Sequence, residues 1–306
     1  MLSKVRFAKS CGLQQRRMGE IDMTGTVSNS AIAAMFVTLF ISLVLPMIVL
    51  IVYGVKNRKQ GVVGAWFIGA AGFFVTQIVI RVPILSALSL MPAFVAFAEN
   101  YYVIYSLMLG LTAALFEVAG RYASAKIMSR NLTFTKGFAA GLGHGGIEAM
   151  VLIGMTYISN LLYVAMINTG AIEGVIAQTE AMGVEVSSEV YALVDTLVNS
   201  PAYLYLLAGY ERILAMIGHV AMTLVVFYFM SKKETLKGIG ICVLYHFVMD
   251  SMVGIIGGLA TPYLGSVISQ NVSYVITYVF LTAMVALAIM AIVKIKAAWK
   301  AESVEV

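Results

Sequence analysis

The chain has 306 residues, of which 61% are hydrophobic and only 11% are charged. Soluble domains carry about 25% charged residues, so this composition excludes a soluble globular protein and indicates an integral membrane protein. The formal net charge of +5 is read as a topology signal, and no nucleic-acid partner is expected. The only two cysteines, Cys11 and Cys242, argue against a disulfide scaffold and against a cysteine-rich zinc site.

The apolar runs are about 20 residues long, which predicts transmembrane helices rather than the alternating strands of a barrel. We expect an all-α, polytopic transmembrane bundle of about seven spans within residues 29–298. The spans are predicted at residues 31–55, 62–84, 103–125, 137–160, 203–230, 238–259 and 273–293. Residues 299–306 follow as a short cytoplasmic tail.

Residues 1–28 disagree with a simple membrane topology. Five basic residues lie in this stretch: Lys4, Arg6, Lys9, Arg16 and Arg17. The stretch has no apolar h-region, so it is not a signal peptide. Our hypothesis is that translation starts at Met18 or Met23, which N-terminal sequencing of the expressed protein tests. The alternative is an eighth span or a re-entrant first segment.

Lysine and arginine otherwise concentrate in every second connection and in the tail. They are Lys56, Arg58, Lys59, Lys126, Arg130, Lys136, Lys232, Lys233, Lys237, Lys294, Lys296 and Lys300. The connections around 92–102, 165–202 and 260–272 hold no lysine or arginine. The positive-inside rule therefore places the basic groups and the C-terminus in the cytoplasm, and seven spans then place the N-terminus outside.

The connection 168–202 is long and acidic. Its apolar residues, such as Ile172, Val175 and Ile176, recur at helical spacing. This pattern predicts one or two amphipathic helices lying on the outer membrane surface. A plain surface loop, or a lid over the bundle, are the alternatives.

Few ionisable residues remain inside the spans, and such residues are costly at membrane depth. They are Arg81, Glu117, Arg121, His144, Glu148, Glu211, Arg212, His219, His246 and Asp250. At 1.5 Å per residue, six of them lie roughly 12–20 Å from the inner helix ends, in the inner half or middle of a bilayer about 30 Å thick: Glu117, His144, Glu148, His219, His246 and Asp250. Polar groups at one level of four helices are typical of a site inside a bundle.

Three ionisable pairs are spaced i,i+4, which places both members on one helix face: Glu117–Arg121, His144–Glu148 and His246–Asp250. Imidazole and carboxylate donors suit Zn²⁺, and His219, His246 and Glu117 would leave one position open. Asp250 is a further ligand or an orienting partner of His246. Glu148 is a candidate general base, and without a metal Glu117 and the histidines could activate water directly.

Each of these residues also has a simpler interpretation. A histidine in a membrane often bonds a neighbouring carbonyl, and Glu117–Arg121 could be a structural ion pair. His144 is interpreted as lining the cavity. Glu211 and Arg212 lie nearer the outer end and are expected to pair with Arg81 or the acidic connection rather than join the site. Arg81 itself is expected to reach outward past Pro83.

The motifs together resemble the YhfC family over about residues 30–298. They are Glu117-x-x-Gly-Arg121, Gly143-His144-Gly-Gly-Ile-Glu148-Ala149, Glu211-Arg212 followed by His219, and His246-x-x-x-Asp250. These bacterial multispan proteins are grouped with the CAAX prenyl protease, bacteriocin-processing and PrsW membrane proteases. The resemblance implies peptide-bond hydrolysis, with Glu117, Arg121, His219, His246 and Asp250 matching the family positions. Phe116 stands where a first glutamate is usual, and Glu148 is our hypothesis for the missing carboxylate.

We therefore expect an intramembrane metallopeptidase of the bacterial cytoplasmic membrane, acting on a membrane-associated peptide or protein. Its catalytic residues are expected to be Glu117, Arg121, Glu148, His219 and His246, with Zn²⁺ as cofactor and with His144 and Glu211 lining the site. The alternative is a proton- or ion-coupled transporter that uses the same residues as a relay. A b-type haem protein fits poorly because acids lie at the same depth as the histidines.

Overall fold

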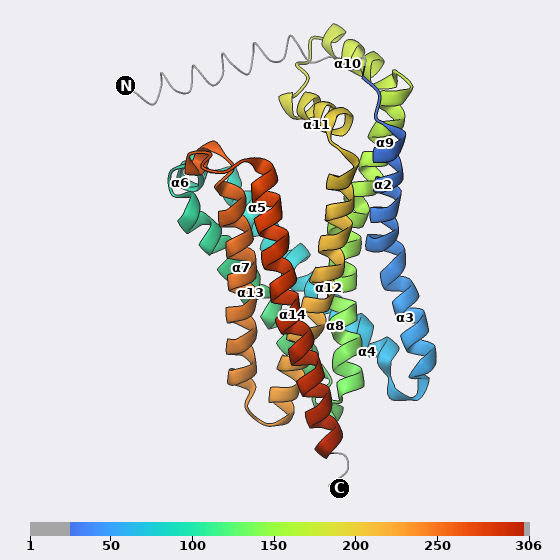
Figure 1. The fold of residues 1–306 in the computed structure, drawn as a ribbon, viewed down its shortest axis with the longest axis vertical. Helices are drawn as coiled ribbons and strands as arrows, with labels where there is room; N and C mark the ends of the chain where they lie inside the picture. The colour runs from blue at the N-terminus through green and yellow to red at the C-terminus, as the bar shows by residue number, and fades with distance from the viewer. Residues whose placement is uncertain (1–24, 303–306) are drawn as a thin grey trace. The chain divides into compact units, whose positions relative to one another are not determined.

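The computed structural model describes residues 25–302. The hypothetical starts at Met18 and Met23 lie outside the described residues, as does the end of the tail. Every regular element in the described part of the chain is helical. The elements are named in Figure 1.

Seven helices are long and apolar enough to cross a membrane, which confirms the prediction of an all-α, seven-span protein. They cover Asn29–Lys56, Val62–Ser89, Tyr102–Ile127, Phe134–Asn168, Ala202–Ser231, Thr235–Gly258 and Gln270–Ala301. The fourth and seventh spans differ most from their predicted ranges of 137–160 and 273–293, each by three residues at its start and eight at its end. The helix of the fourth span continues to Asn168 and ends before Gly170, whose φ of +73° suits a helix end.

The chain forms two compact units. The first contains α2 (Asn29–Leu39), α9 (Met155–Asn168), α10 (Ala171–Ala181), α11 (Ser188–Asn199) and the start of α12 (Ala202–Ser231). Thr38 donates to the Tyr205 carbonyl at 2.6 Å, which ties α2 to α12. Helices α10 and α11 agree with the helical spacing predicted for 168–202, and their Ile172, Val194 and Leu197 are buried.

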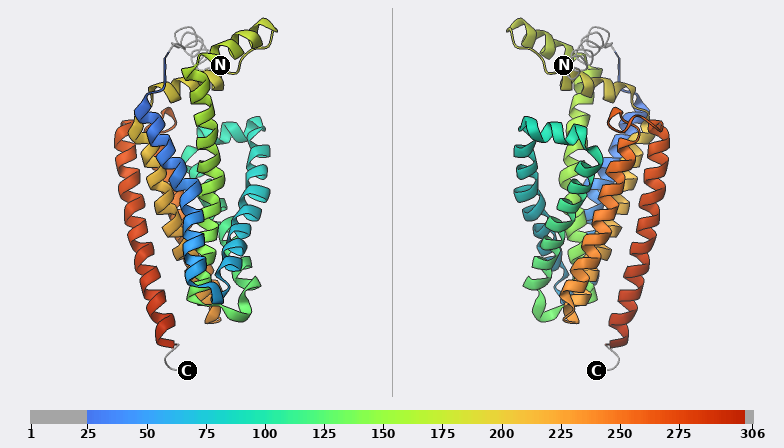
Figure 2. Two further views of the ribbon diagram at one scale, coloured as in Figure 1. Left: turned by 90° about the vertical axis from the view of Figure 1, so that its right-hand side faces the viewer. Right: turned by 90° about the vertical axis from the view of Figure 1, so that its left-hand side faces the viewer.

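The second unit, residues 41–153 with those from 210 onward, holds all the ionisable residues predicted for the site. Its helices are α3 (Leu45–Lys56), α4 (Val62–Phe73), α5 (Val82–Ser89), α6 (Pro92–Asn100), α7 (Tyr102–Ile127), α8 (Phe134–Glu148), the remainder of α12, α13 (Thr235–Gly258) and α14 (Gln270–Glu302). Helix α4 packs against α8, and α7 packs against α13 and α4 (Figure 2). Two π-helical stretches, η3 (Phe74–Arg81) and η5 (Ala149–Gly154), continue α4 and α8.

Helix α8 approaches two neighbours with its backbone because glycine stands at the crossing points. A Cβ added to Gly143 would lie 1.9 Å from the Trp66 carbonyl oxygen of α4, and one added to Gly141 would lie 2.6 Å from Val220 Cα of α12. Small residues are the usual means of close helix approach in membranes. This contact brings the side chains of α8 within reach of those on α12.

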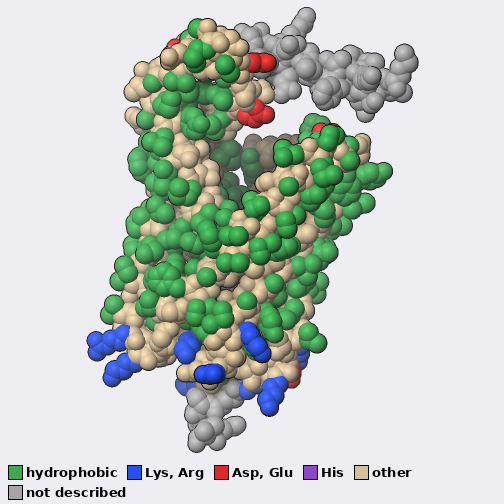
Figure 3. Space-filling view, turned by 180° about the vertical axis from the view of Figure 1, so that it is seen from behind, with side chains coloured by type: hydrophobic (Ala, Val, Ile, Leu, Met, Phe, Trp, Pro, Cys, Tyr) green, Lys and Arg blue, Asp and Glu red, His purple; other side chains and the backbone are tan. Residues whose placement is uncertain are grey.

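The Lys and Arg side chains visible on the surface of the second unit gather at one end, as Figure 3 shows. This end contains the turns between α3 and α4, between α7 and α8, and between α12 and α13. We call it the basic end. No histidine is visible on the face drawn in Figure 3, in keeping with the burial of all three.

We expect Gly143→Ala to destabilise the protein strongly, because a methyl group would collide with the rigid backbone of α4. Gly240→Ala on α13 is the matched control, because nothing lies within 4 Å of its added Cβ. Thermal unfolding in detergent measures both variants. Equal melting temperatures for the two variants would contradict the close backbone approach.

Candidate active site

Four helices of the second unit each bring two ionisable side chains to one buried place. Glu117 and Arg121 lie on α7 and His144 and Glu148 on α8. Arg212 and His219 lie on α12, and His246 and Asp250 on α13. Glu117 is 5% exposed, and Arg121 and the three histidines are at most 2% exposed.

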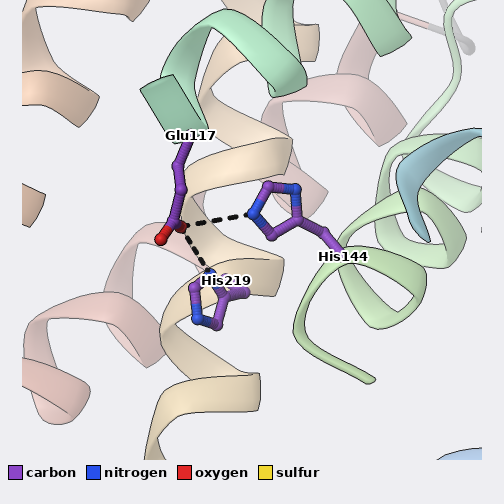
Figure 4. Close-up of side chains that lie close together, drawn as sticks. All are labelled: Glu117, His144 and His219. Carbon is purple, nitrogen blue, oxygen red and sulfur yellow. Dashed lines mark hydrogen bonds and ion pairs between the residues drawn. The ribbon is translucent and has the colours of Figure 1, made fainter. Parts of the chain in front are cut away.

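The Oε2 atom of Glu117 is the centre of this cluster. His144 Nε2 lies 3.3 Å from it, His246 Nδ1 3.6 Å and His219 Nδ1 3.7 Å. Arg121 Nη2 also donates to the same oxygen at 3.1 Å. Figure 4 shows the Glu117, His144 and His219 side chains converging from α7, α8 and α12. Three imidazoles and one guanidinium therefore surround a single buried carboxylate oxygen.

His219 is held from both sides. Its Nε2 lies 2.6 Å from Glu148 Oε2, and Arg121 Nη2 lies 2.5 Å from its Nδ1. Because a guanidinium can only donate and a carboxylate can only accept, we assign the proton of neutral His219 to Nε2. Arg212 Nη1 donates to the other oxygen of Glu148 at 2.9 Å and also pairs with Glu211.

In its neutral form, His246 presents an unprotonated nitrogen to Glu117. Its Nε2 lies 3.2 Å from Asp250 Oδ2, so Nε2 carries the proton of the neutral ring. Its Nδ1 has no hydrogen-bond partner among the described residues and faces Glu117 Oε2. Two acceptors that face each other in a buried site repel, unless a proton, a water or a metal cation lies between them.

Gln77 is a site residue that the sequence reasoning missed. It is buried, and its Nε2 donates to Glu117 Oε1 at 2.8 Å. Arg81 Nη1 in turn donates to Gln77 Oε1 at 3.2 Å. Both residues lie on the π-helical stretch η3, and such stretches are frequent at functional sites. The i,i+4 spacing of Gln77 and Arg81 is a usable signal, but Gln77 carries no charge and so does not stand out among the ionisable residues of the spans.

A cavity of about 350 Å³ reaches the cluster. Glu117 and Glu148 line it, together with Gln77, Arg212 and Asp250. The Asp250 side chain is 34% exposed, far more than the histidines. A substrate in this cavity would therefore meet both glutamates.

The cluster fits a divalent metal such as zinc in its donor chemistry. Glu117, His144 and His219 each offer a donor atom within 4.8 Å of the other two, and His246 adds the Nδ1 described above. Imidazole nitrogen and carboxylate oxygen are the usual ligands of catalytic zinc. Asp250 contacts the ring nitrogen of His246 that does not face Glu117, which is an orienting position.

Two expectations for the arginines were wrong. Arg81 does not reach outward but turns to α7, where Nη2 donates to the Leu109 carbonyl at 2.8 Å and Nε to Thr112. Arg212 does join the site, because the close packing of α8 and α12 places Glu148 within its reach. Glu211 lies at the edge of the same network as the second partner of Arg212.

We expect Arg212→Met to cost about 3–5 kcal/mol, the typical cost of removing one partner of a buried ion pair. It leaves Glu148 without the cation that compensates its charge. Lys237→Met is the matched control, because Lys237 and Glu234 form an exposed pair worth about 1 kcal/mol or less. Unfolding by SDS titration in mixed micelles measures both. A cost for Arg212→Met no larger than for Lys237→Met would contradict this ion-pair network.

Two comparisons with known proteins give a match to this chain. Over 212 residues the chain is 28% identical to an uncharacterized membrane protein, YhfC, of Bacillus subtilis (strain 168). This alignment covers 69% of the present chain and 79% of the Bacillus protein. No solved structure matches the chain. The model of a protein family described as YhfC intramembrane metalloprotease matches residues 41–277, which are well over half of the chain. The chain is thus a multi-pass membrane protein that belongs to the YhfC intramembrane metalloprotease family.

Proposed function

We propose that the protein is an intramembrane metallopeptidase that hydrolyses a peptide bond of a membrane-associated protein or peptide. The observation that carries this proposal is the convergence of three imidazole nitrogens on Glu117 Oε2 within 3.3–3.7 Å. The cluster lies at a cavity that a substrate can occupy. Family membership supports the same activity.

In this proposal zinc is held by Glu117, His219 and His246. Each of the three has a partner that fixes its orientation: Gln77 for Glu117, Glu148 for His219 and Asp250 for His246. His144 lacks such a partner, because its Nδ1 makes no hydrogen bond within residues 25–302. Ligands of metal ions almost always have an outer partner of this kind. We therefore assign His144 to orienting Glu117 and not to the metal.

Zinc bound there supplies a Lewis acid that polarises the scissile carbonyl and activates water. Glu148 is the candidate general base, because it lines the cavity and each of its oxygens keeps a lone pair beyond its contacts to His219 and Arg212. It takes the proton of the attacking water and returns it to the leaving amine. Gln77 and His144 hold the Glu117 carboxylate in place.

The orientation in the membrane is also part of the proposal. The basic end faces the cytoplasm of a bacterial cell by the positive-inside rule, which puts the C-terminus inside and the N-terminus outside. The bilayer and a membrane-associated polypeptide are the expected partners.

We expect purified wild-type protein to hold about one zinc per chain, as one three-ligand site predicts. His219→Ala and His246→Ala should lose it, because each removes one of three protein ligands. His144→Ala is the matched control, a buried histidine of the same cluster that should keep the metal. Inductively coupled plasma mass spectrometry after gel filtration gives the stoichiometry.

Three other results would each change this assignment. Loss of zinc in His144→Ala with retention in His246→Ala would replace His246 by His144 as a ligand. Cleavage without metal in the wild type would leave Glu117 to activate water directly. A protein with neither metal nor cleavage of any membrane peptide would leave the transporter as the better hypothesis.

We expect Arg121→Gln to tighten zinc binding about tenfold or more, a change of at least about 1.4 kcal/mol. The Arg121 guanidinium lies 2.5 Å from His219 Nδ1 and 3.1 Å from Glu117, so its positive charge opposes a metal cation there. Lys126→Gln on the same helix removes a charge at the basic end and should leave affinity unchanged. Competition with a fluorescent zinc chelator measures both. Weaker zinc binding in Arg121→Gln would mean that the guanidinium helps to build the site.

A further inference from the structure

The cavity at the site extends along only one half of α7. Tyr102, Tyr105, Leu109, Ala113 and Glu117 of α7 all line it. Tyr102 begins the helix, and it lies fifteen residues or about 22 Å from Glu117. No α7 residue after Glu117 lines the cavity in the described part of the chain, although the helix continues to Ile127 at the basic end. The cavity therefore runs from Glu117 toward the end opposite the basic end.

The other three helices show the same direction. On α13 the lining residues Asp250 and Gly254 follow His246, and this helix starts at the basic end with Thr235. On α12 Arg212 precedes His219, and this helix finishes at the basic end with Ser231. Leu152 of η5 lines the cavity four residues beyond Glu148. Each of α7, α12, α13 and the α8–η5 helix thus lines the cavity with residues that lie farther from the basic end than its own site residue. That site residue is Glu117 on α7 and a histidine on the other three helices.

On the side of the basic end, packed side chains close the bundle. Val118 of α7, Ala140 of α8 and Cys242 of α13 belong to one buried apolar cluster with the residues that follow His219 on α12. The α12 residues include Leu224 and Phe227, which are completely buried. Packed protein cores hold few voids larger than a water molecule, and the cavity that Glu117 lines has no wall residue from this cluster.

We infer that the substrate reaches Glu117 from the end opposite the basic end, which is the extracytoplasmic side in the proposed orientation. The inference rests on the proposed function of the site and names its substrate class. Much of the cavity wall is apolar and aromatic, with Phe73, Ile78, Tyr102, Tyr105 and Leu109 among its residues. Glu117 and Glu148 lie at its floor, and Arg81 lies on the wall beside Leu109. Its volume of about 350 Å³ accepts a few residues and not a folded domain. The substrate is an apolar segment of an exported or membrane-anchored polypeptide, which enters from the outer side and is cut at the depth of Glu117, in the inner half or middle of the bilayer.

Cysteine accessibility in cells tests the route. In a full-length Cys11→Ser, Cys242→Ser background, Leu109→Cys places a thiol on the cavity wall, and Tyr105→Cys is a second variant in case the first does not fold. A sulfonated, membrane-impermeant methanethiosulfonate is added to intact cells. The protein is then denatured and treated with a polyethylene-glycol maleimide, which labels the thiols that the first reagent did not block. Each labelled thiol slows the protein on a gel, and this gel shift is measured. We expect the cavity cysteines to lose most of this shift.

Two controls make the result directional. Leu107→Cys lies at the same depth of α7, does not line the cavity and is exposed on the outside of the bundle, so it should keep its shift in intact cells. Lys126→Cys at the basic end should lose its shift only in inverted membrane vesicles.

Three outcomes would overturn the inference: cavity cysteines that react only in inverted vesicles, cavity cysteines that react in neither preparation, or Lys126→Cys reacting in intact cells. The reagent needs water access and neither metal nor catalysis. This experiment can therefore fail or succeed independently of the zinc measurement.

Discussion

The burial of one carboxylate, Glu117, is the constraint on which the rest of this structure depends. An ionised carboxylate in a bilayer is costly unless charges and hydrogen bonds compensate it. Here Gln77 satisfies one oxygen, while Arg121 and the three histidines surround the other. Two of the compensating groups, His219 and His246, have acidic partners of their own in Glu148 and Asp250, and Arg212 in turn pairs with Glu148. The polar network is thus a consequence of one central charge.

That network needs helices closer together than leucine-rich packing allows. An imidazole is short, so rings from α8, α12 and α13 can meet a glutamate on α7 only if the backbones approach. Gly141 and Gly143 provide this approach on two sides of α8. Gly145 of the same helix lies against His219, where an added Cβ would be 3.0 Å from the histidine Cβ. The glycines of the His144 motif are therefore part of the site's construction.

The sequence was sufficient for the spans and for the level of the polar residues, because hydropathy and the i,i+4 spacing are local properties. It was insufficient for partner choice between helices. Arg212 pairs with Glu148 because glycine lets α8 and α12 pack closely, and Arg81 turns to α7 from the π-helical stretch η3. Neither the glycine contact nor the π-helical stretch is visible in a local sequence pattern. The ranking of the histidines shows the same limit. Their depths are similar, and only the Asp250 and Glu148 contacts distinguish His246 and His219 from His144.

The one-sided cavity also bears on the choice between a peptidase and a transporter. A coupled transporter must open its ion site alternately to both sides of the membrane, usually by rocking one set of helices against another. Here the residues below the cluster on α7, α8, α12 and α13 belong to a single packed core, with Phe227 and Leu224 completely buried. Opening that side would separate four helices at once and expose their apolar contacts. A peptidase needs only one entrance, and a closed floor prevents a proton-carrying site from leaking across the membrane.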